Sequence, residues 1–147
     1  MILPFKFNVM YPIDLVRPMA DELNRVGFQS LSTPEEVSIK LQEDQGTALL
    51  VVNSVCGCAA ANARPGVRMA IQHTTKPDHL YTVFAGVDTA ATAKAREFLI
   101  PYPPSSPAIA LFKNGRLVHM IERHQIEGRS AQMIADNLIG AFNTYCN

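Results

Sequence analysis

Residues 48–58 read ALLVVNSVCGC, and this stretch decides how the rest of the chain is interpreted. The aliphatic run 48–53 is too short for a free-standing helix and predicts a buried strand. The residues that follow are typical of a helix, so the strand delivers Cys56 and Cys58 to a helix N-terminus. Unpaired backbone N–H groups and a partial positive charge at that end favour a thiolate over a thiol. Because the thiolate is the nucleophile in disulfide exchange, the stretch predicts a thiol–disulfide active site.

A second stretch, residues 106–118, reads SPAIALFKNGRLV and closely resembles the proline-strand-hairpin segment of thioredoxins. In that fold the proline follows a cis peptide bond and faces the redox cysteines. The resemblance implies a cis bond between Ser106 and Pro107, and it implies that both residues support the active site. Within the same stretch, Asn114-Gly115 is a strong signal for a two-residue hairpin.

Capping and turn residues predict the remaining elements. Pro18 at a first helical position and a capping box at 33–36 predict two helices before the first strand, closed by Gly27 and Gly46. The later elements are expected as a helix over 59–72 with a kink near Pro65-Gly66, a strand over 80–87, a helix over 89–99, strands over 108–112 and 117–121, and a helix over 127–145. The order from residue 48 is β-α-β-α-β-β-α, with a parallel first strand pair and an antiparallel last pair. We predict an α/β fold, a thioredoxin-like three-layer α/β/α sandwich on a mixed sheet with two additional N-terminal helices.

Composition narrows the class of protein. The chain has 147 residues, 48% of them hydrophobic, which fits a single domain over 1–147. Thirteen basic and thirteen acidic residues cancel, so charge gives no support for a nucleic-acid or membrane partner. Residues 1–8 lack the basic start of a secretory signal, and three cysteines do not make a disulfide scaffold. These features favour a cytoplasmic protein with a reactive cysteine pair, and they leave its oligomeric state open.

The stretch 53–68, NSVCGCAAANARPGVR, resembles the signature of the bacilliredoxin family, and 18–23, 33–37 and 124–129 agree with it. Members of that family are thioredoxin-like proteins with a Cys-Gly-Cys motif. They are associated with removing bacillithiol from S-bacillithiolated proteins and with weak disulfide isomerase activity. The resemblance implies Cys56 as the attacking cysteine, Cys58 as its partner and Gly57 as support. It also implies S-thiolated client proteins as partners, and bacillithiol or another low-molecular-weight thiol as co-substrate, with no further cofactor.

Whether the two cysteines bridge each other stays open at this point. Residues two apart on a helix point about 200° apart at about 100° per residue, so a Cys56–Cys58 disulfide needs local backbone distortion. Gly57 can absorb such distortion. Cys146, next to the C-terminus, is expected to be a frayed, exposed thiol.

Two other groups of side chains invite a functional interpretation. Arg64 and Arg68 lie one helical turn apart, either on a solvated face or where they attract a carboxylate-bearing thiol such as bacillithiol. A metal site would need partners for the cysteine pair, because structural zinc usually takes four ligands. The candidates form no recognisable second pair, so no metal is predicted; they are Cys146, His73, His79, His119 and His124.

Three functions follow from these patterns. The leading hypothesis is a thiol–disulfide oxidoreductase that acts on mixed disulfides between proteins and a small thiol. The second keeps the fold and changes the reaction to isomerisation or oxidation of protein disulfides. The third is a non-enzymatic metal-binding or redox-sensing thioredoxin-like module.

Overall fold

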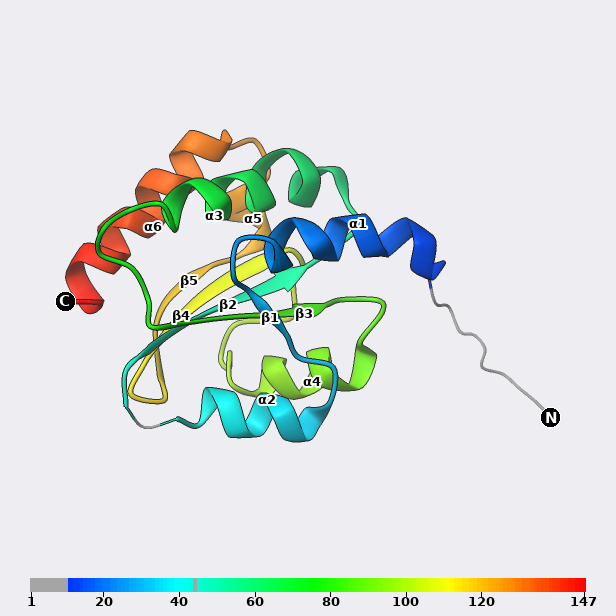
Figure 1. Ribbon diagram of the computed structural model, residues 1–147, viewed down its shortest axis with the longest axis horizontal. Helices are drawn as coiled ribbons and strands as arrows, with labels where there is room; N and C mark the ends of the chain where they lie inside the picture. The colour runs from blue at the N-terminus through cyan, green and yellow to red at the C-terminus, as the bar shows by residue number, and fades with distance from the viewer. Residues whose placement is uncertain (1–10, 44) are drawn as a thin grey trace.

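The computed structural model describes residues 11–43 and 45–147. Five strands form one sheet in the order β1-β3-β2-β4-β5, with helices on both faces (Figure 1). The strands are β1 Gln29–Ser30, β2 Thr47–Asn53, β3 His79–Phe84, β4 Ala108–Lys113 and β5 Arg116–Ile121. The helices are α1 Ile13–Asn24, α2 Pro34–Leu41, η1 Ala59–Ala63, α3 Arg64–Ala70, α4 Thr89–Glu97, α5 Arg123–Ile126 and α6 Ala131–Tyr145.

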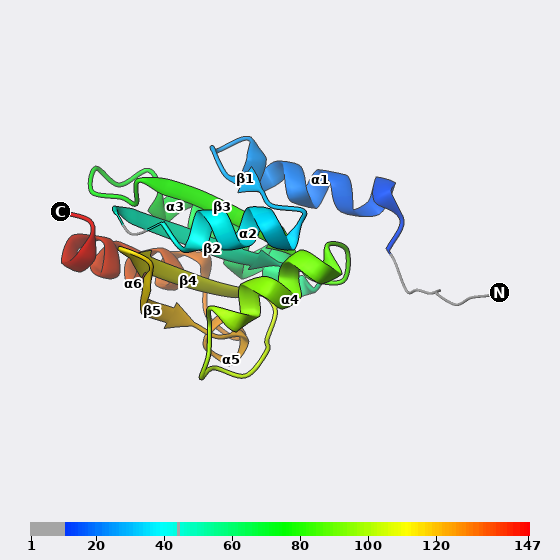
Figure 2. The ribbon, with the colours of Figure 1, turned by 90° about the horizontal axis from the view of Figure 1, so that it is seen from below.

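The predicted three-layer sandwich on a mixed sheet is confirmed. β3 runs parallel to β2, whereas β4 is antiparallel to both β2 and β5. Alternate side chains of β2 enter two separate cores, because successive strand residues point to opposite faces. Leu49 and Val51 pack with α1, α3, α5 and α6, while Leu50 and Val52 pack with α2 and α4. Figure 2, seen from below, has α2 and α4 in front of the sheet.

Two turn predictions are confirmed in detail. The capping box at the start of α2 is complete: the Glu36 backbone N–H donates to Thr33 Oγ1 at 3.1 Å, and the Glu36 side chain accepts from the Thr33 backbone. In the β4–β5 hairpin, Asn114 and Gly115 have φ values of 51° and 78°. Both residues are therefore left-handed, as a two-residue turn of this kind requires.

Several element boundaries differ from the sequence prediction. Pro18 lies inside α1 and not at its first position, where it costs one intrahelical hydrogen bond. Gly46, with φ +87°, turns the chain into β2 and does not close α2, which ends at Leu41. The two-residue strand β1 was not predicted.

The predicted helix over 127–145 is confirmed as α6, but it begins four residues later than predicted, at Ala131. Gly128 adopts φ +77°, and the Ser130 hydroxyl accepts a hydrogen bond from the Met133 N–H as the N-cap. The short helix α5, before this range, was not predicted. The predicted helix over 59–72 begins with a π-helical segment, η1, in which the Arg64 N–H bonds to the Ala59 carbonyl. The irregularity therefore lies just before Pro65 and Gly66.

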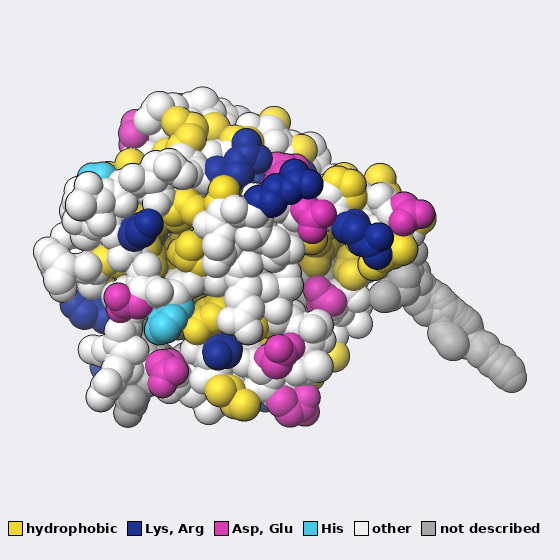
Figure 3. Space-filling view, in the orientation of Figure 1, with side chains coloured by type: hydrophobic (Ala, Val, Ile, Leu, Met, Phe, Trp, Pro, Cys, Tyr) yellow, Lys and Arg dark blue, Asp and Glu magenta, His cyan; other side chains and the backbone are white. Residues whose placement is uncertain are grey.

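The surface matches the balanced composition. On the face in Figure 3, basic and acidic side chains are interspersed, and neither sign gathers into a large patch. Among the described residues, every helix is too short or too polar to cross a bilayer. The expectation about a secretory signal concerns residues 1–8, which lie outside the described residues.

Candidate active site

Three loops meet at one edge of the sheet. β2 ends at Asn53 and is followed by the cysteine loop, residues 54–58. Val52 pairs with Ala108, so Ser106 and Pro107 lie at the same edge, directly before β4. Ile109 pairs with Ile121, which brings the start of α5 to that edge as well. The predicted cis bond between Ser106 and Pro107 is confirmed, and a second cis bond, before Pro101, was not predicted.

The two candidate active-site cysteines are close together. Cys56 and Cys58 are both free thiols and partly buried, and their Sγ atoms lie 2.7 Å apart. A disulfide bond is about 2.04 Å long, so a small side-chain movement closes this pair. A Cβ added at Gly57 would meet no described atom within 4 Å outside its chain neighbours and its own helix, and Gly57 has no positive φ. In the reduced form, therefore, neither crowding nor backbone conformation requires glycine between the cysteines.

Cys56 has the environment of a thiolate. Its carbonyl oxygen accepts hydrogen bonds from the N–H groups of Ala59 and Ala60, which confirms its predicted place at a helix N-terminus. Burial alone would raise the pKa of the Cys56 thiol. Hydrogen bonds from the Cys58 side chain, the Ala59 N–H and the Ser54 hydroxyl outweigh burial and hold the pKa of Cys56 below its ordinary value.

The pKa of Cys58 is shifted in the opposite direction, above its ordinary value. Burial raises the pKa of the Cys58 thiol, and the hydrogen bond to Cys56 and the negative charge on Cys56 raise it further. The positive charge of Arg123 opposes this increase in pKa, and the charge of Glu127 adds to it. The site therefore favours ionisation of Cys56 over ionisation of Cys58.

Arg123 is a site residue that the sequence analysis missed. Its Nη1 donates to the Ser106 carbonyl oxygen at 3.0 Å, and its Nε lies 3.2 Å from Glu127 Oε2. The hydrogen bond to Glu127, followed by the charges of Cys58 and Cys56, raises the pKa of the Arg123 guanidinium. A basic residue two positions after the last strand, at the edge that carries the cysteines, was the available signal.

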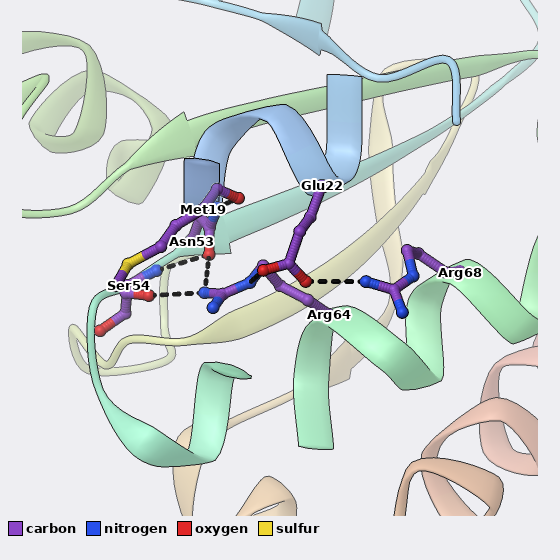
Figure 4. Close-up of polar contacts among 6 residues, drawn as sticks. All are labelled: Met19, Glu22, Asn53, Ser54, Arg64 and Arg68. Atoms are coloured by element: carbon purple, nitrogen blue, oxygen red, sulfur yellow. Dashed lines mark hydrogen bonds and ion pairs between the residues drawn. The ribbon is translucent and has the colours of Figure 1, made fainter. Parts of the chain in front are cut away.

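Arg64 corrects a sequence-based expectation. It is 1% exposed, so it neither lies on a solvated face nor faces a substrate carboxylate. Figure 4 shows its guanidinium among Asn53, Ser54 and Glu22. Arg68, one turn further, is partly exposed and donates from Nη1 to Glu22 Oε1 at 2.7 Å. The two arginines differ because α1 packs over the first and leaves the second at the surface.

The candidate metal ligands are dispersed. In residues 11–43 and 45–147, no three His, Cys, Asp or Glu side chains are arranged to hold a metal ion. His73 and His119 instead pair with asparagine side chains, at 2.9 Å and 2.6 Å. Cys146 is half-buried against the core and not frayed, and burial raises the pKa of its thiol.

Comparisons with known proteins agree with this geometry. The family described as "Disulphide isomerase" matches residues 11–146. A bacilliredoxin of Cytophaga hutchinsonii is 60% identical over 129 residues, covering 88% of this chain and 95% of that protein. A bacilliredoxin of Halalkalibacterium halodurans is 50% identical over 136 residues, covering 92% and 94% of the two chains.

Solved structures show the same fold. The thioredoxin of Malassezia sympodialis has a TM-score of 0.56 at 16% identity, covering 82% of this chain and 92% of that one. The thioredoxin of Aeropyrum pernix has a TM-score of 0.52 at 23% identity, covering 77% and 84%. With the paired cysteines at the edge of a thioredoxin-like sheet, the chain belongs to the bacilliredoxins, within the family described as "Disulphide isomerase", and is a thiol–disulfide oxidoreductase.

Proposed function

We propose that this oxidoreductase removes a low-molecular-weight thiol, such as bacillithiol, from mixed disulfides on client proteins. The observation that carries the proposal is the unequal cysteine pair, in which the pKa of Cys56 is lowered and that of Cys58 is raised. Of two neighbouring thiols, the one that ionises more readily is suited to attack, and the other is suited to resolve the adduct that forms. The names of the bacilliredoxin relatives favour the same chemistry.

In the first step, the Cys56 thiolate attacks the small-thiol sulfur of the mixed disulfide. A new S–S bond joins Cys56 to the small thiol as the bond to the client breaks. The client sulfur leaves as a thiolate and takes a proton from solvent, so the client is reduced and Cys56 carries the adduct. Disulfide exchange of this kind needs no bound cofactor.

In the second step, Cys58 attacks Cys56 Sγ. The charge on Cys56 is one cause of the raised pKa of Cys58, and this charge disappears once Cys56 is in a disulfide. The Cys58 thiol then ionises more readily and attacks, which releases the small thiol and closes a Cys56–Cys58 disulfide. A thiol reductant restores the pair. The 2.7 Å separation of the sulfur atoms supports this route. The alternative is attack on the adduct by a second small thiol, which releases the small-thiol disulfide.

The client chain is expected to bind along Ser106 and Pro107 by main-chain hydrogen bonds. The Ser106 carbonyl oxygen accepts from Arg123 and keeps one lone pair for a client N–H. Arg123, and not Arg64, is then the exposed cation beside the cysteines that meets a carboxylate on the small thiol. Because a thiol reductant must restore the cysteine pair, the proposal places the protein in the cytoplasm, where thiols are kept reduced.

Intact mass spectrometry after exposure to oxidised bacillithiol tests the proposal. We expect one bacillithiol adduct on Cys56 in the Cys58→Ser variant, and none on Cys58 in the Cys56→Ser variant. A second arm uses a client protein that carries bacillithiol on its cysteine, and it measures release of the small thiol in a single turnover. Retained release in Cys58→Ser and lost release in Cys56→Ser are the expected results.

The other two functions give different masses. Absence of an adduct in the Cys58→Ser variant, together with reshuffling of protein disulfides, would replace the proposal with the isomerase activity that the family description names. Retention of a metal in a native-mass measurement would instead support a metal-binding module.

A further inference from the structure

Arg64 is among the largest fully buried side chains of the protein, and the exchange mechanism above does not use it. Arginine is almost never fully buried unless its charge is paired, because removing a cation from water is costly. Its contacts therefore indicate what the buried charge is for.

The Arg64 guanidinium joins three parts of the chain (Figure 4). Nη1 donates to Asn53 Oδ1 at 3.0 Å, at the end of β2, and to the Ser54 carbonyl oxygen at 2.9 Å, in the cysteine loop. Nε lies 3.3 Å from Glu22 Oε2 on α1. One planar group thus ties Ser54, the first residue of the cysteine loop, to α1. The contact residue on α1, Glu22, precedes Arg64 by 42 positions in the sequence.

A chain of contacts continues from these partners to Cys56. Asn53 Oδ1 also accepts from the Ser54 N–H at 2.8 Å, while Asn53 Nδ2 donates to the Met19 carbonyl on α1 at 3.3 Å. The Ser54 hydroxyl oxygen accepts from the Cys56 N–H at 3.2 Å. The same hydroxyl is one of the groups that lower the pKa of the Cys56 thiol. Whatever fixes Ser54 therefore fixes a hydrogen-bond partner of the attacking sulfur.

Hydrogen bonds link Arg64 to Cys56. The causes that lower the pKa of Cys56 most are hydrogen bonds from Cys58, Ala59 and Ser54, and Arg64 holds the last of these three residues. A lysine would keep the positive charge but lose the planar fork that reaches Ser54, Asn53 and Glu22 together.

We propose that Arg64 is a positioning residue for thiol exchange at Cys56: it holds Asn53 and Ser54 so that the Ser54 hydroxyl stays on Cys56, and it couples α1 to the reactivity of that thiol. The proposal rests on Cys56 as the attacking cysteine in the proposed function. It does not depend on which small thiol is the co-substrate.

The pH profile of Cys56 alkylation tests this role, because it needs neither client nor bacillithiol. Iodoacetamide labelling, with the modified cysteine identified by peptide mass mapping, is followed against pH in Arg64→Lys, Arg64→Gln and Arg68→Gln. We expect both Arg64 variants to shift the Cys56 midpoint toward the free-cysteine value, by a similar amount. Arg68→Gln is the matched control, since Arg68 pairs with the same Glu22 but reaches no residue of the cysteine loop in the described contacts. It is expected to keep the native midpoint.

Circular dichroism establishes that each variant is folded before its profile is interpreted. If the Arg64 variants do not fold, Ser54→Ala and Glu22→Gln probe the same contacts from their two ends, and both are expected to raise the Cys56 midpoint. A folded Arg64→Gln protein with the native profile would overturn the proposal. So would an Arg64→Lys protein that matches the wild type while Arg64→Gln shifts, since charge alone would then suffice. Failure of the bacillithiol experiment with a shifted alkylation profile would reject the co-substrate and leave the role of Arg64 intact.

Discussion

Two arginines hold the two loops of the active site, and they do so in different surroundings. Arg64 Nη1 donates to the Ser54 carbonyl in the cysteine loop, and Arg123 Nη1 donates to the Ser106 carbonyl before Pro107. The Arg64 side chain is 2% exposed, whereas that of Arg123 is 42% exposed. The arginine–carbonyl hydrogen bond is thus shielded from solvent in the cysteine loop. In the loop before Pro107, solvent, ions and ligands can reach it.

The difference assigns the two arginines different tasks. Removing one partner of a buried, hydrogen-bonded ion pair leaves polar groups stranded in the interior, while an exposed pair is solvated and screened. Arg64 therefore belongs to the permanent structure around Cys56. Arg123 lies where it influences Cys58 and can exchange its partners during turnover.

The largest expected effect is on stability. Arg64→Ala is expected to lower the free energy of unfolding by about 1–3 kcal/mol, because it leaves the Ser54 carbonyl without its buried donor. Arg123→Ala is expected to leave the unfolding midpoint almost unchanged. Urea denaturation followed by circular dichroism measures both. Equal losses in the two variants would contradict the contrast between the two loops.

The second effect is the order in which the cysteines titrate. Alkylation of the wild-type protein against pH is expected to label Cys56 at lower pH than Cys58, with the Cys56 midpoint below the free-cysteine value of about 8.5. The sign follows from the structure, since hydrogen bonds stabilise the Cys56 thiolate while burial and the Cys56 charge disfavour that of Cys58. Labelling of Cys58 first would reverse the assignment of the attacking cysteine.

A third, smaller effect is the salt dependence of the shifts in cysteine labelling midpoint that variants of the two arginines cause. Arg123→Gln is expected to move the Cys58 labelling midpoint to higher pH, because the Arg123 charge lowers the pKa of Cys58. Because Arg123 is exposed, the difference from the wild type should shrink as salt rises from about 0.01 to 1 M, over which the Debye length falls from about 30 to 3 Å. The shift caused by Arg64→Gln at Cys56 should persist across the same salt range.

The smallest expected effect is at Gly57. Gly57→Ala should change the free energy of unfolding by less than about 1 kcal/mol, because the added Cβ has open space among the described residues. Thermal unfolding measures this change. A large loss would mean that glycine, and not the contacts of Arg64, sets the conformation of the cysteine loop.

Local patterns were sufficient to predict the fold and the cysteine pair. The continuous aliphatic run of β2, the Asn114-Gly115 turn and the Ser106-Pro107 step are short-range signals, and the structure agrees with each. Arg64 could not be placed in this way, because its burial depends on Glu22, 42 positions away, and on how α1 packs over α3. Spacing placed Arg64 and Arg68 on one helix face, but it could not show that α1 covers only the first.

The start of the last helix could not be predicted for a related reason. The sequence pattern places Gly128 inside the helix, whereas its positive φ keeps it outside α6, which begins at Ala131. Glycine is compatible with both conformations, so the local sequence does not decide between them.

The π-helical turn η1 sets the angular phase between Cys56 and Arg64. At about 100° per residue, eight residues of regular α-helix would leave Arg64 about 80° around the axis from Cys56. A π turn takes up one extra residue, which reduces that offset to about 20°. Deleting one exposed alanine, Ala61, would convert the turn to a regular one and keep both residues in phase. Adding one residue to a regular helix at the same place would rotate Arg64 away from Ser54. The segment therefore tolerates the loss of one residue, but it does not tolerate an insertion that lengthens a regular helix.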